Sequence, residues 1–392
     1  MLTVLEQGFI TLVRSCLKNK KIALPEGFDT SKLYEAAKIH HMMNIIYTGA
    51  VLCGIDKELP EMKKLFVGAL REASIEEIQH KEIERVKKLF SKEGIDFMPL
   101  KGALLKGLYP LPYMRYMSDI DILIRMEQYE RISSILKEAG YEFRLESDHE
   151  YVWKKKNVLN IELHKMLIPS YNKDFYRYFG DGWNKAVKGE CGFSMSKEDE
   201  FIYIFTHFAK HYRSRGAGVK YLTDIYLFLN SYELDCKYIE EELSKLKLLE
   251  FYKNILETID CWFEGKCLTE KAELISSFII RSGAYGTHDN GMASSLLRQK
   301  ANNPKNKKGI KTRLIISRTF PSLSVMRIHN KYLDKAPFLL PVAWIKRLVV
   351  ALIKKRKNIA RHIDDIKRIS SKNIWDFESQ LKFVGLDFDF RE

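Results

Sequence analysis

The segment Arg115-Tyr-Met-Ser-Asp-Ile-Asp-Ile-Leu-Ile124 contains two aspartates, Asp119 and Asp121, in a run of branched apolar residues. The run predicts a β-strand, and the side chains of a strand alternate between its two faces. Both carboxylates therefore share one face. Because two carboxylates on one face repel each other unless a cation neutralises them, the pattern indicates a divalent metal site. Oxygen ligands of this kind suit Mg²⁺, with Mn²⁺ as the alternative ion.

Residues on either side of this strand extend the predicted site. Glu162, in Asn160-Ile-Glu-Leu-His164, supplies a third carboxylate on a neighbouring strand, and three carboxylates can hold two metal ions about 4 Å apart. Upstream, Lys101-Gly102 lies where a short strand meets a helix, and backbone N–H groups at such a junction favour phosphate. Asp-x-Asp alone is a common pattern, so the alternative is that Asp119 caps a turn and Asp121 faces solvent.

The segment that surrounds these residues predicts a small sheet. Short apolar stretches bounded by turn residues indicate strands at 95–100, 120–124, 141–145, 150–154 and 158–163, with helices at 103–108 and 128–139. Asn157 is a turn residue between the last two strands. Two strand–helix pairs followed by three strands are typical of an α+β fold with mixed strand directions.

The rest of the chain has helical periodicity. Helices are expected at 5–16, 29–46, 61–92, 198–212 and 220–230, with more between 237 and 282, a solvated loop at 302–309 and a basic helical tail from Pro337. We therefore expect four segments. They are an N-terminal helical segment (1–93), an α/β core (94–170), a larger helical domain (171–300) and a basic helical C-terminal region (301–392).

Composition adds two expectations. The net charge of +14 favours anionic partners such as nucleotides, nucleic acid or anionic lipid, although free use of lysine explains it equally well. The six cysteines form no C-x-x-C pair, which fits thiols in a reducing compartment. The N-terminus does not read as a secretion signal, and no apolar run is long enough to span a bilayer. We expect a cytoplasmic protein.

Several stretches together resemble a known family. They are Pro99-Leu-Lys-Gly-Ala-Leu-Leu-Lys-Gly-Leu-Tyr-Pro110, Arg115, Ser118-Asp-Ile-Asp-Ile-Leu-Ile124, Glu35-Ala-Ala-Lys-Ile-His40, Ile161-Glu-Leu-His164, Thr206-His-Phe-Ala-Lys-His211, Lys220-Tyr-Leu-Thr-Asp224, and Pro337-Phe-Leu-Leu-Pro341 with Trp344 and Arg347. They are similar to a poorly characterised bacterial nucleotidyltransferase family of the polymerase-β superfamily. The resemblance covers most of the chain, and its central motif is fairly specific.

The resemblance implies an enzyme that moves a nucleoside monophosphate from a nucleoside triphosphate to an acceptor hydroxyl, with Mg²⁺ as cofactor. Asp119, Asp121 and Glu162 would bind the metal, and Lys101 with Gly102 would hold the triphosphate. The superfamily usually has Gly-Ser at that turn, whereas Lys-Gly stands here. A lysine can contact phosphate as a point charge where serine would use its hydroxyl.

Other residues of the similar stretches are candidates for nucleotide binding or for the cleft. Arg115 and Ser118 are assigned to the nucleotide, although Arg115 can equally pair with a nearby carboxylate. His164 shares a strand face with Glu162 and either contacts substrate, orients a metal ligand or makes a structural hydrogen bond.

Two pairs of residues four apart on predicted helices are further cleft candidates. His207 and His211 share one helical face but have no third zinc ligand, so they line the cleft or pack against the sheet domain. Lys220 and Asp224 either reach the cleft or form a surface ion pair.

The acceptor and the C-terminal tail leave alternatives open. The acceptor is a small molecule or a glycan precursor; in a toxin-like transferase it is tRNA or a protein. A third alternative is a catalytically degenerate nucleotide-binding protein. The tail, with Phe338-Leu-Leu-Pro-Val-Ala-Trp344 and the basic run 354–357, can lie on an anionic membrane, bind nucleic-acid phosphate, or pack on the helical domain. The membrane reading would suit a peripheral protein that acts on lipid-linked glycans.

Overall fold

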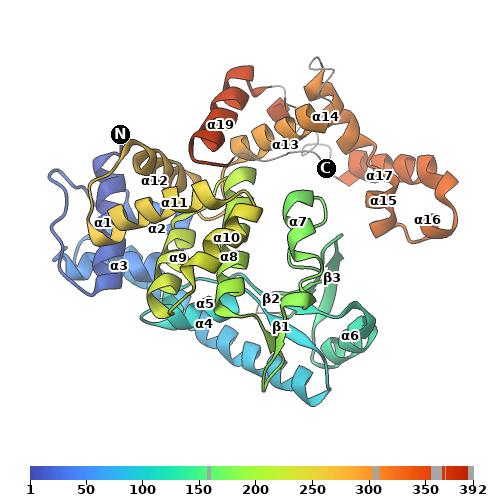
Figure 1. The fold of residues 1–392 in the computed structure, drawn as a ribbon, viewed down its shortest axis with the longest axis horizontal. Coiled ribbons are helices and arrows are strands. Elements are labelled where there is room, and N and C mark those ends of the chain that lie inside the picture. Colours follow the sequence, from blue (N-terminus) through green and yellow to red (C-terminus); the bar gives the residue numbers. More distant parts are fainter. Residues whose placement is uncertain (157–159, 303–308, 355–363, 367, 387–392) are drawn as a thin grey trace.

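A five-stranded mixed sheet lies at the centre of the fold (Figure 1). The structure is a computed structural model that describes residues 1–156, 160–302, 309–354, 364–366 and 368–386. The strands occur in the order β1 (Phe97–Pro99), β2 (Asp119–Ile124), β5 (Asn160–His164), β4 (Glu150–Lys154) and β3 (Glu142–Glu146). The pair β2–β5 is parallel and the other pairs are antiparallel. The predicted α+β class with mixed strand directions is confirmed.

The two faces of this sheet carry different side chains, because successive residues of a strand point to opposite faces. Ile120 and Ile122 of β2 point into a core that is closed by α4 (Pro60–Lys92) and α6 (Tyr129–Glu138). Asp119 and Asp121 therefore point to the opposite face. Burial of the isoleucine side fixes the register of β2, since a slip of one residue would place the aspartates in the core.

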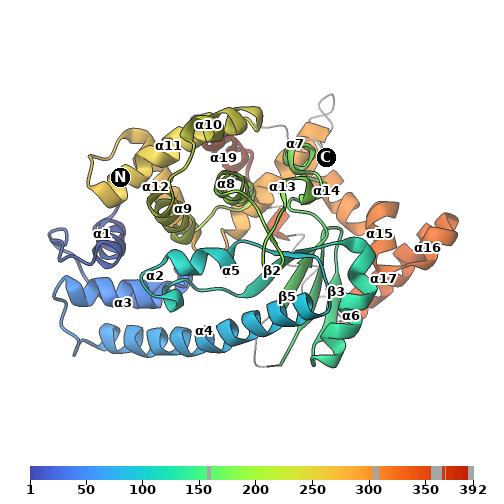
Figure 2. The ribbon, with the colours of Figure 1, turned by 60° about the horizontal axis from the view of Figure 1, so that its bottom comes forward.

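Most of the helices form one body. The N-terminal helices are α1 (Val4–Lys18), α2 (Leu33–His40) and α3 (Met43–Leu52), and the later ones are α7 (Lys173–Phe179), α8 (Lys197–Ser214), α9 (Val219–Ser231), α10 (Cys236–Lys245), α11 (Leu249–Ile259) and α12 (Glu270–Ser282). Phe9 and Ile46 belong to the same buried cluster as Phe205, Phe251 and Ile275. Figures 1 and 2 both show α1 beside α11 and α12. The N-terminal helices and the helices that follow the sheet thus share a core, and the four-segment division stays a prediction.

Two predicted elements are corrected. The helix expected at 29–46 is wrong as a single helix, because His41 adopts a left-handed φ of 52° that ends α2 before α3 begins. The helix expected at 103–108 is a single α-turn, α5 (Gly102–Leu105), followed by a 3₁₀ turn, η1 (Lys106–Leu108). Asn157 and the start of the strand expected at 158–163 lie outside the described residues. A small hairpin, β6 (Val187–Lys188) and β7 (Phe193–Ser194), precedes α8.

The C-terminal region consists of several short helices. They are α13 (His288–Asn302), α14 (Ile310–Thr319), α15 (Leu323–His329), α16 (Tyr332–Lys335), α17 (Leu340–Lys354) and α19 (Ser371–Phe383). One side of α17 packs on α15 and α16 through a small cluster that includes Met326, Leu333 and Ala343. Its other side exposes large apolar side chains, among them Ile345 and Ile353, so the tail does not pack its whole apolar surface on the helical domain.

The predicted loop at 302–309 and the predicted basic run at 354–357 are described only in part. Of the loop expected at 302–309, residues 303–308 are outside the described residues, as are residues 355–357 of the basic run. In the described part of the chain, no helix has both the length and the hydropathy to cross a bilayer.

Candidate active site

The carboxylate face of the sheet opens into a cavity of about 520 Å³. Strands β2, β4 and β5 form one side, and α8 with α9 forms the other. All twelve residues predicted from the sequence line it: Lys101, Gly102, Arg115, Ser118, Asp119, Asp121, Glu162, His164, His207, His211, Lys220 and Asp224. The fold therefore brings them to one place.

The three acidic residues lie on adjacent, parallel strands. Asp121 is the direct neighbour of Glu162 across the β2–β5 pair. The ligand atoms of Asp121, Glu162 and His164 all lie within 4.8 Å of one another, so His164 joins the compact donor group. The Asp119 carboxylate also lines the cavity and accepts a hydrogen bond of 3.1 Å from the Ser118 hydroxyl. The strand pairing explains the grouping, because both strands present alternate residues to the same face.

The charges of these carboxylates oppose one another. Burial, together with the charges of Asp119 and Asp121, raises the pKa of Glu162 to about 8. Burial and the charge of Asp121 also raise the pKa of Asp119. Although burial acts against it, Asp121 has a pKa well below its usual range because Lys101 and His164 stabilise its charged form. A crowded group of oxygen donors with such shifts fits a divalent cation, which would relieve the repulsion.

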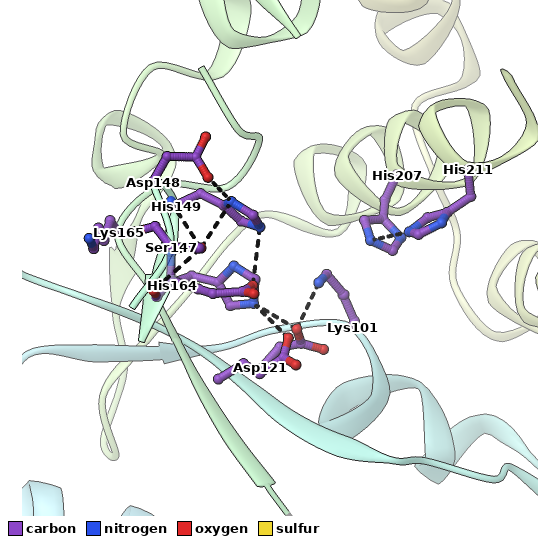
Figure 3. A network of polar contacts seen from close by, with 11 residues as sticks. Lys101, Asp121, Ser147, Asp148, His149, His164, Lys165, His207 and His211 are labelled. Carbon is purple, nitrogen blue, oxygen red and sulfur yellow. Dashed lines mark hydrogen bonds and ion pairs between the residues drawn. The ribbon is translucent and has the colours of Figure 1, made fainter. Parts of the chain in front are cut away.

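Lys101 neutralises one of the carboxylates. Its Nζ donates to Asp121 Oδ1 at 2.7 Å, as Figure 3 shows. Lys101 has φ 47°, an uncommon conformation for a non-glycine residue. This conformation turns the chain after β1 into the start of α5. Burial opposes its charge, but Asp121 more than compensates and raises the pKa of Lys101 above its usual range. The side chain assigned to the triphosphate is therefore engaged with the predicted metal ligand Asp121.

Gly102 is needed for a close approach. A Cβ at this position would lie 2.7 Å from Met117 Sδ and 2.8 Å from an Arg115 guanidinium nitrogen. Any side chain would displace the side chains of Met117 and Arg115, which belong to the segment that leads into β2. The glycine thus lets the Lys101-Gly102 turn pack beside the start of the aspartate strand.

His164 fixes Asp121 from the other side. Its Nε2 lies 2.7 Å from Asp121 Oδ1, and its buried Nδ1 has no hydrogen-bond partner among the described residues. Burial, aided by the charge of Lys101, lowers the pKa of His164, so the ring is neutral and donates from Nε2. The sequence predicted that His164 contacts substrate, orients a metal ligand or makes a structural hydrogen bond. The hydrogen bond that it makes is to the predicted metal ligand Asp121.

The family comparison agrees with this arrangement. A model of a family described as uncharacterised nucleotidyltransferases matches residues 26–264, which is more than half of the chain. This chain is a member of that family. No curated protein and no solved structure matched the chain. The matched stretch includes all twelve predicted site residues, and nucleotidyl transfer is accordingly the general role of this nucleotidyltransferase.

Arg115 and Asp224 form a buried ion pair in the nucleotidyltransferase. Arg115 Nε donates to Asp224 Oδ1 at 2.7 Å, a second guanidinium nitrogen donates to Oδ2 at 2.8 Å, and the Tyr109 hydroxyl donates to Oδ1 at 2.7 Å. Asp224 therefore pairs with Arg115 in the interior and not with Lys220 on a helix surface. The pair joins the loop before β2 to α9, which positions α9 against the sheet.

The α8 side of the cavity is basic. His207 and His211 contact each other through their Nε2 atoms at 3.1 Å (Figure 3). Burial and the nearby Lys101 and Lys210 hold both histidine pKa values well below the usual range. Burial and Lys101 also lower the pKa of Lys210 to about 7. This side of the cavity, which faces the carboxylates, thus carries groups whose protonated forms an anionic ligand would stabilise.

Some cavity residues are not among the twelve predicted from the sequence. Lys210 and His149 carry charge at the cavity, and Tyr116, Tyr171 and Tyr285 supply rings. His149 contacts Asp148 at 2.7 Å and Glu150 at 3.1 Å; burial opposes its charge, but these two carboxylates raise the pKa of His149 to about 9. Lys210 lies within the family-like stretch 206–211, yet its basic type alone did not distinguish it from a solvated lysine.

Proposed function

We propose that this nucleotidyltransferase moves a nucleoside monophosphate from a nucleoside triphosphate to an acceptor hydroxyl in a metal-dependent reaction. The observation that carries the proposal is the division of one cavity into an acidic and a basic side. Asp119, Asp121 and Glu162 lie on the sheet, and Lys210 and Lys220 lie on α8 and α9. A triphosphate with its divalent cation has both charges, and therefore complements both sides.

Asp119, Asp121 and Glu162 are the residues that would hold the metal. Their oxygens match the preference of Mg²⁺, and Mn²⁺ would also accept the imidazole of His164. When bound, the ion would neutralise charge on the α-phosphate and acidify the acceptor hydroxyl. Glu162, the direct neighbour of Asp121 on β5, is the carboxylate that would accept that hydroxyl's proton.

The neighbouring residues would position these groups. Lys101 and His164 hold Asp121 by hydrogen bonds to the same oxygen, which leaves Oδ2 free of both. Gly102 allows the phosphate-binding turn to approach β2, and Lys210 and Lys220 would attract the leaving pyrophosphate. In this assignment Lys101 links the carboxylate site to the phosphate site. We extend the proposal to the superfamily: the Asp-x-Asp strand, its third carboxylate and the preceding turn support a polymerase-β relationship.

The direct test replaces the two aspartates separately. Asp119→Asn and Asp121→Asn should each lower nucleotidyl transfer at least about 100-fold, since even residues that only support metal ligands are worth 10–100-fold. Transfer is measured from radiolabelled triphosphates in Mg²⁺ and in Mn²⁺, with Glu142→Gln, at an exposed position of β3, as a control on the same domain. Retained transfer in both variants would reject the assignment.

The acceptor is resolved by the same assay. Small-molecule pools, glycan precursors, total RNA and total protein are offered in parallel, and the label identifies the acceptor class. We propose a small molecule or a glycan precursor; label in tRNA or in protein would instead establish the toxin-like alternative. Nucleotide binding without any product, in protein that binds Mg²⁺, would identify a degenerate binding protein.

A second proposal concerns association with an anionic membrane. Phe338, Val342, Ile345, Val349 and Leu352 follow one another at three- and four-residue intervals, and all are exposed. Phe338 precedes α17 and the other four lie on it. The side chain of Lys346 is exposed beside them, and the sequence continues with a basic run. Such a helix face suits the interface of an anionic bilayer, which would make the protein a peripheral one in the cytoplasm.

Sedimentation with vesicles tests this second proposal on the full chain. Ile345→Glu with Ile353→Glu should abolish binding to phosphatidylserine vesicles, whereas Val187→Glu, at another exposed apolar position, should not. Equal binding by the double variant and the control would refute membrane contact through α17.

A further inference from the structure

Three aromatic rings from distant parts of the chain meet at the cavity. The rings of His41 and Tyr116 stack with centroids 4.4 Å apart and an interplanar angle of 13°. Tyr285 meets His41 edge-on at 5.4 Å. Tyr116 and Tyr285 both line the cavity, and Tyr285 is 62% exposed. The Tyr285 ring is thus held against His41 while it lines the cavity and keeps much of its surface exposed.

The backbone holds these rings in place. His41 occupies the left-handed junction between α2 and α3, and Tyr285 lies in the loop between α12 and α13. Gly283 and Gly286 on either side of Tyr285 both have positive φ, and the backbone N–H of Ala284 donates to the Ile39 carbonyl at 3.1 Å. The tyrosine loop is therefore tied to the end of α2. A ring fixed in this way loses little conformational entropy when it binds a ligand.

The position of the rings along the cavity indicates what they face. Tyr116 lies three residues before the start of β2, in the segment 115–117 that packs on Gly102 of the proposed phosphate turn. The other end of the cavity lies beyond the carboxyl end of β5, where His164, Leu167 and Tyr171 line it. Glu162 is the direct neighbour of Asp121 across the β2–β5 pair, so the carboxylates do not distinguish the two ends. The ring end, beside the phosphate turn, suits the donor nucleoside.

We infer that Tyr285 and Tyr116, with His41 behind them, form a stacking platform for the nucleobase of the donor triphosphate. The inference rests on the proposed function and deepens it, since it assigns the base-binding part of the same cavity. Stacking uses the face of the base and not its hydrogen-bonding edge, so a purine, with its larger ring system, gains more than a pyrimidine. Tyr285 lies outside residues 26–264, so part of the platform comes from beyond the family match.

Equilibrium binding of ATP, CTP and inorganic tripolyphosphate in Mg²⁺ separates the base from the phosphates. Tyr285→Leu should weaken ATP about 5- to 150-fold, the range that corresponds to one base–aromatic stack, and should weaken CTP less. Tripolyphosphate should bind the variant as it binds the unaltered protein. Tyr285→Phe retains the ring and should retain the affinity for ATP. Tyr332→Leu, at an exposed tyrosine on α16, is the matched control.

Each outcome of this experiment is decisive. Unchanged ATP affinity in Tyr285→Leu, or an equal loss for ATP and tripolyphosphate, would overturn the platform. If the unaltered protein binds neither ATP nor tripolyphosphate, the proposed function itself fails. If Tyr285→Leu instead weakens only an acceptor found in the transfer assay, the rings face the acceptor and the inference is wrong. Should Tyr285→Leu fail to fold, Tyr116→Leu provides the same comparison, with the same selective loss of ATP expected.

Discussion

The sheet side and the α8 side of the cavity carry opposite charges. The pKa values of their ionisable groups are shifted in opposite directions. On the sheet, burial and neighbouring carboxylates raise the pKa of Glu162 to about 8. On α8, burial and Lys101 lower the pKa of Lys210 to about 7. In each case the low-dielectric cavity and a like charge disfavour the ionised form. Both groups are therefore poised to lose or gain a proton near neutral pH.

The difference in charge between the two sides indicates which ligand would lower the electrostatic cost of both. A metal ion alone would stabilise the sheet side but would oppose the charge on α8, and a free anion would do the reverse. A triphosphate that carries its own divalent cation lowers the electrostatic cost on both sides at once. Lys101 partly serves this purpose by crossing from the phosphate turn to Asp121.

The largest expected effect comes from removing the negative charge at the centre of the sheet side. Glu162→Gln should lower nucleotidyl transfer on the order of 1,000-fold, about 4 kcal/mol, because a charge that stabilises the reacting centre in a buried site is lost. The assay is transfer at saturating triphosphate and metal. Glu142→Gln, on the outer strand β3 with an exposed side chain, is the control and should keep its activity. Equal activity in both variants would remove Glu162 from the reaction.

The next effect concerns the contact that joins the two sides. Lys101→Met should destabilise the metal-free protein by about 3 kcal/mol, since Asp121 would remain buried without its cationic partner. Mg²⁺ should restore part of this loss, because the ion would take over the neutralisation of Asp121. Urea unfolding with and without Mg²⁺ measures both terms. If Mg²⁺ stabilises the variant no more than the unaltered protein, Lys101 and the ion do not share Asp121.

The sheet side was far easier to predict from the sequence than the α8 side. Asp119, Asp121 and Glu162 follow from the two-residue alternation of strands, which is a local property. Lys210 faces them only because α8 packs across the cavity, and that packing depends on contacts between distant residues. Asp224 illustrates the same point: its neighbour at helical spacing is Lys220, but its partner is Arg115, 109 residues earlier. The shared core of α1 and α8–α12 was likewise invisible to local periodicity.

The sheet side should make the stability of the protein fall as the pH rises through the acidic and neutral range. Glu162 has a folded-state pKa of about 8, above its unfolded value near 4.5, so the folded state holds this proton more tightly. Its contribution to stability is thus present at low pH and is lost as the pH rises from about 4.5 to 8, by about 2 kcal/mol after allowance for screening. Urea unfolding across this range measures the fall. Glu162→Gln should abolish it, and so should saturating Mg²⁺ in the unaltered protein.

The α8 side should give the smaller and opposite effect. Lys210 has a folded-state pKa of about 7, below its unfolded value near 10.5, so the unfolded chain binds this proton more tightly. Stability should therefore rise with pH between about 7 and 10.5, by about 1 kcal/mol because the side chain is partly exposed. Lys210→Met should remove the rise, while Lys237→Met, at an exposed lysine on α10, should keep it. Tripolyphosphate should also remove it by keeping Lys210 protonated, whereas Mg²⁺ alone should not. A rise that persists in Lys210→Met would mean that another group of the cavity carries the low pKa.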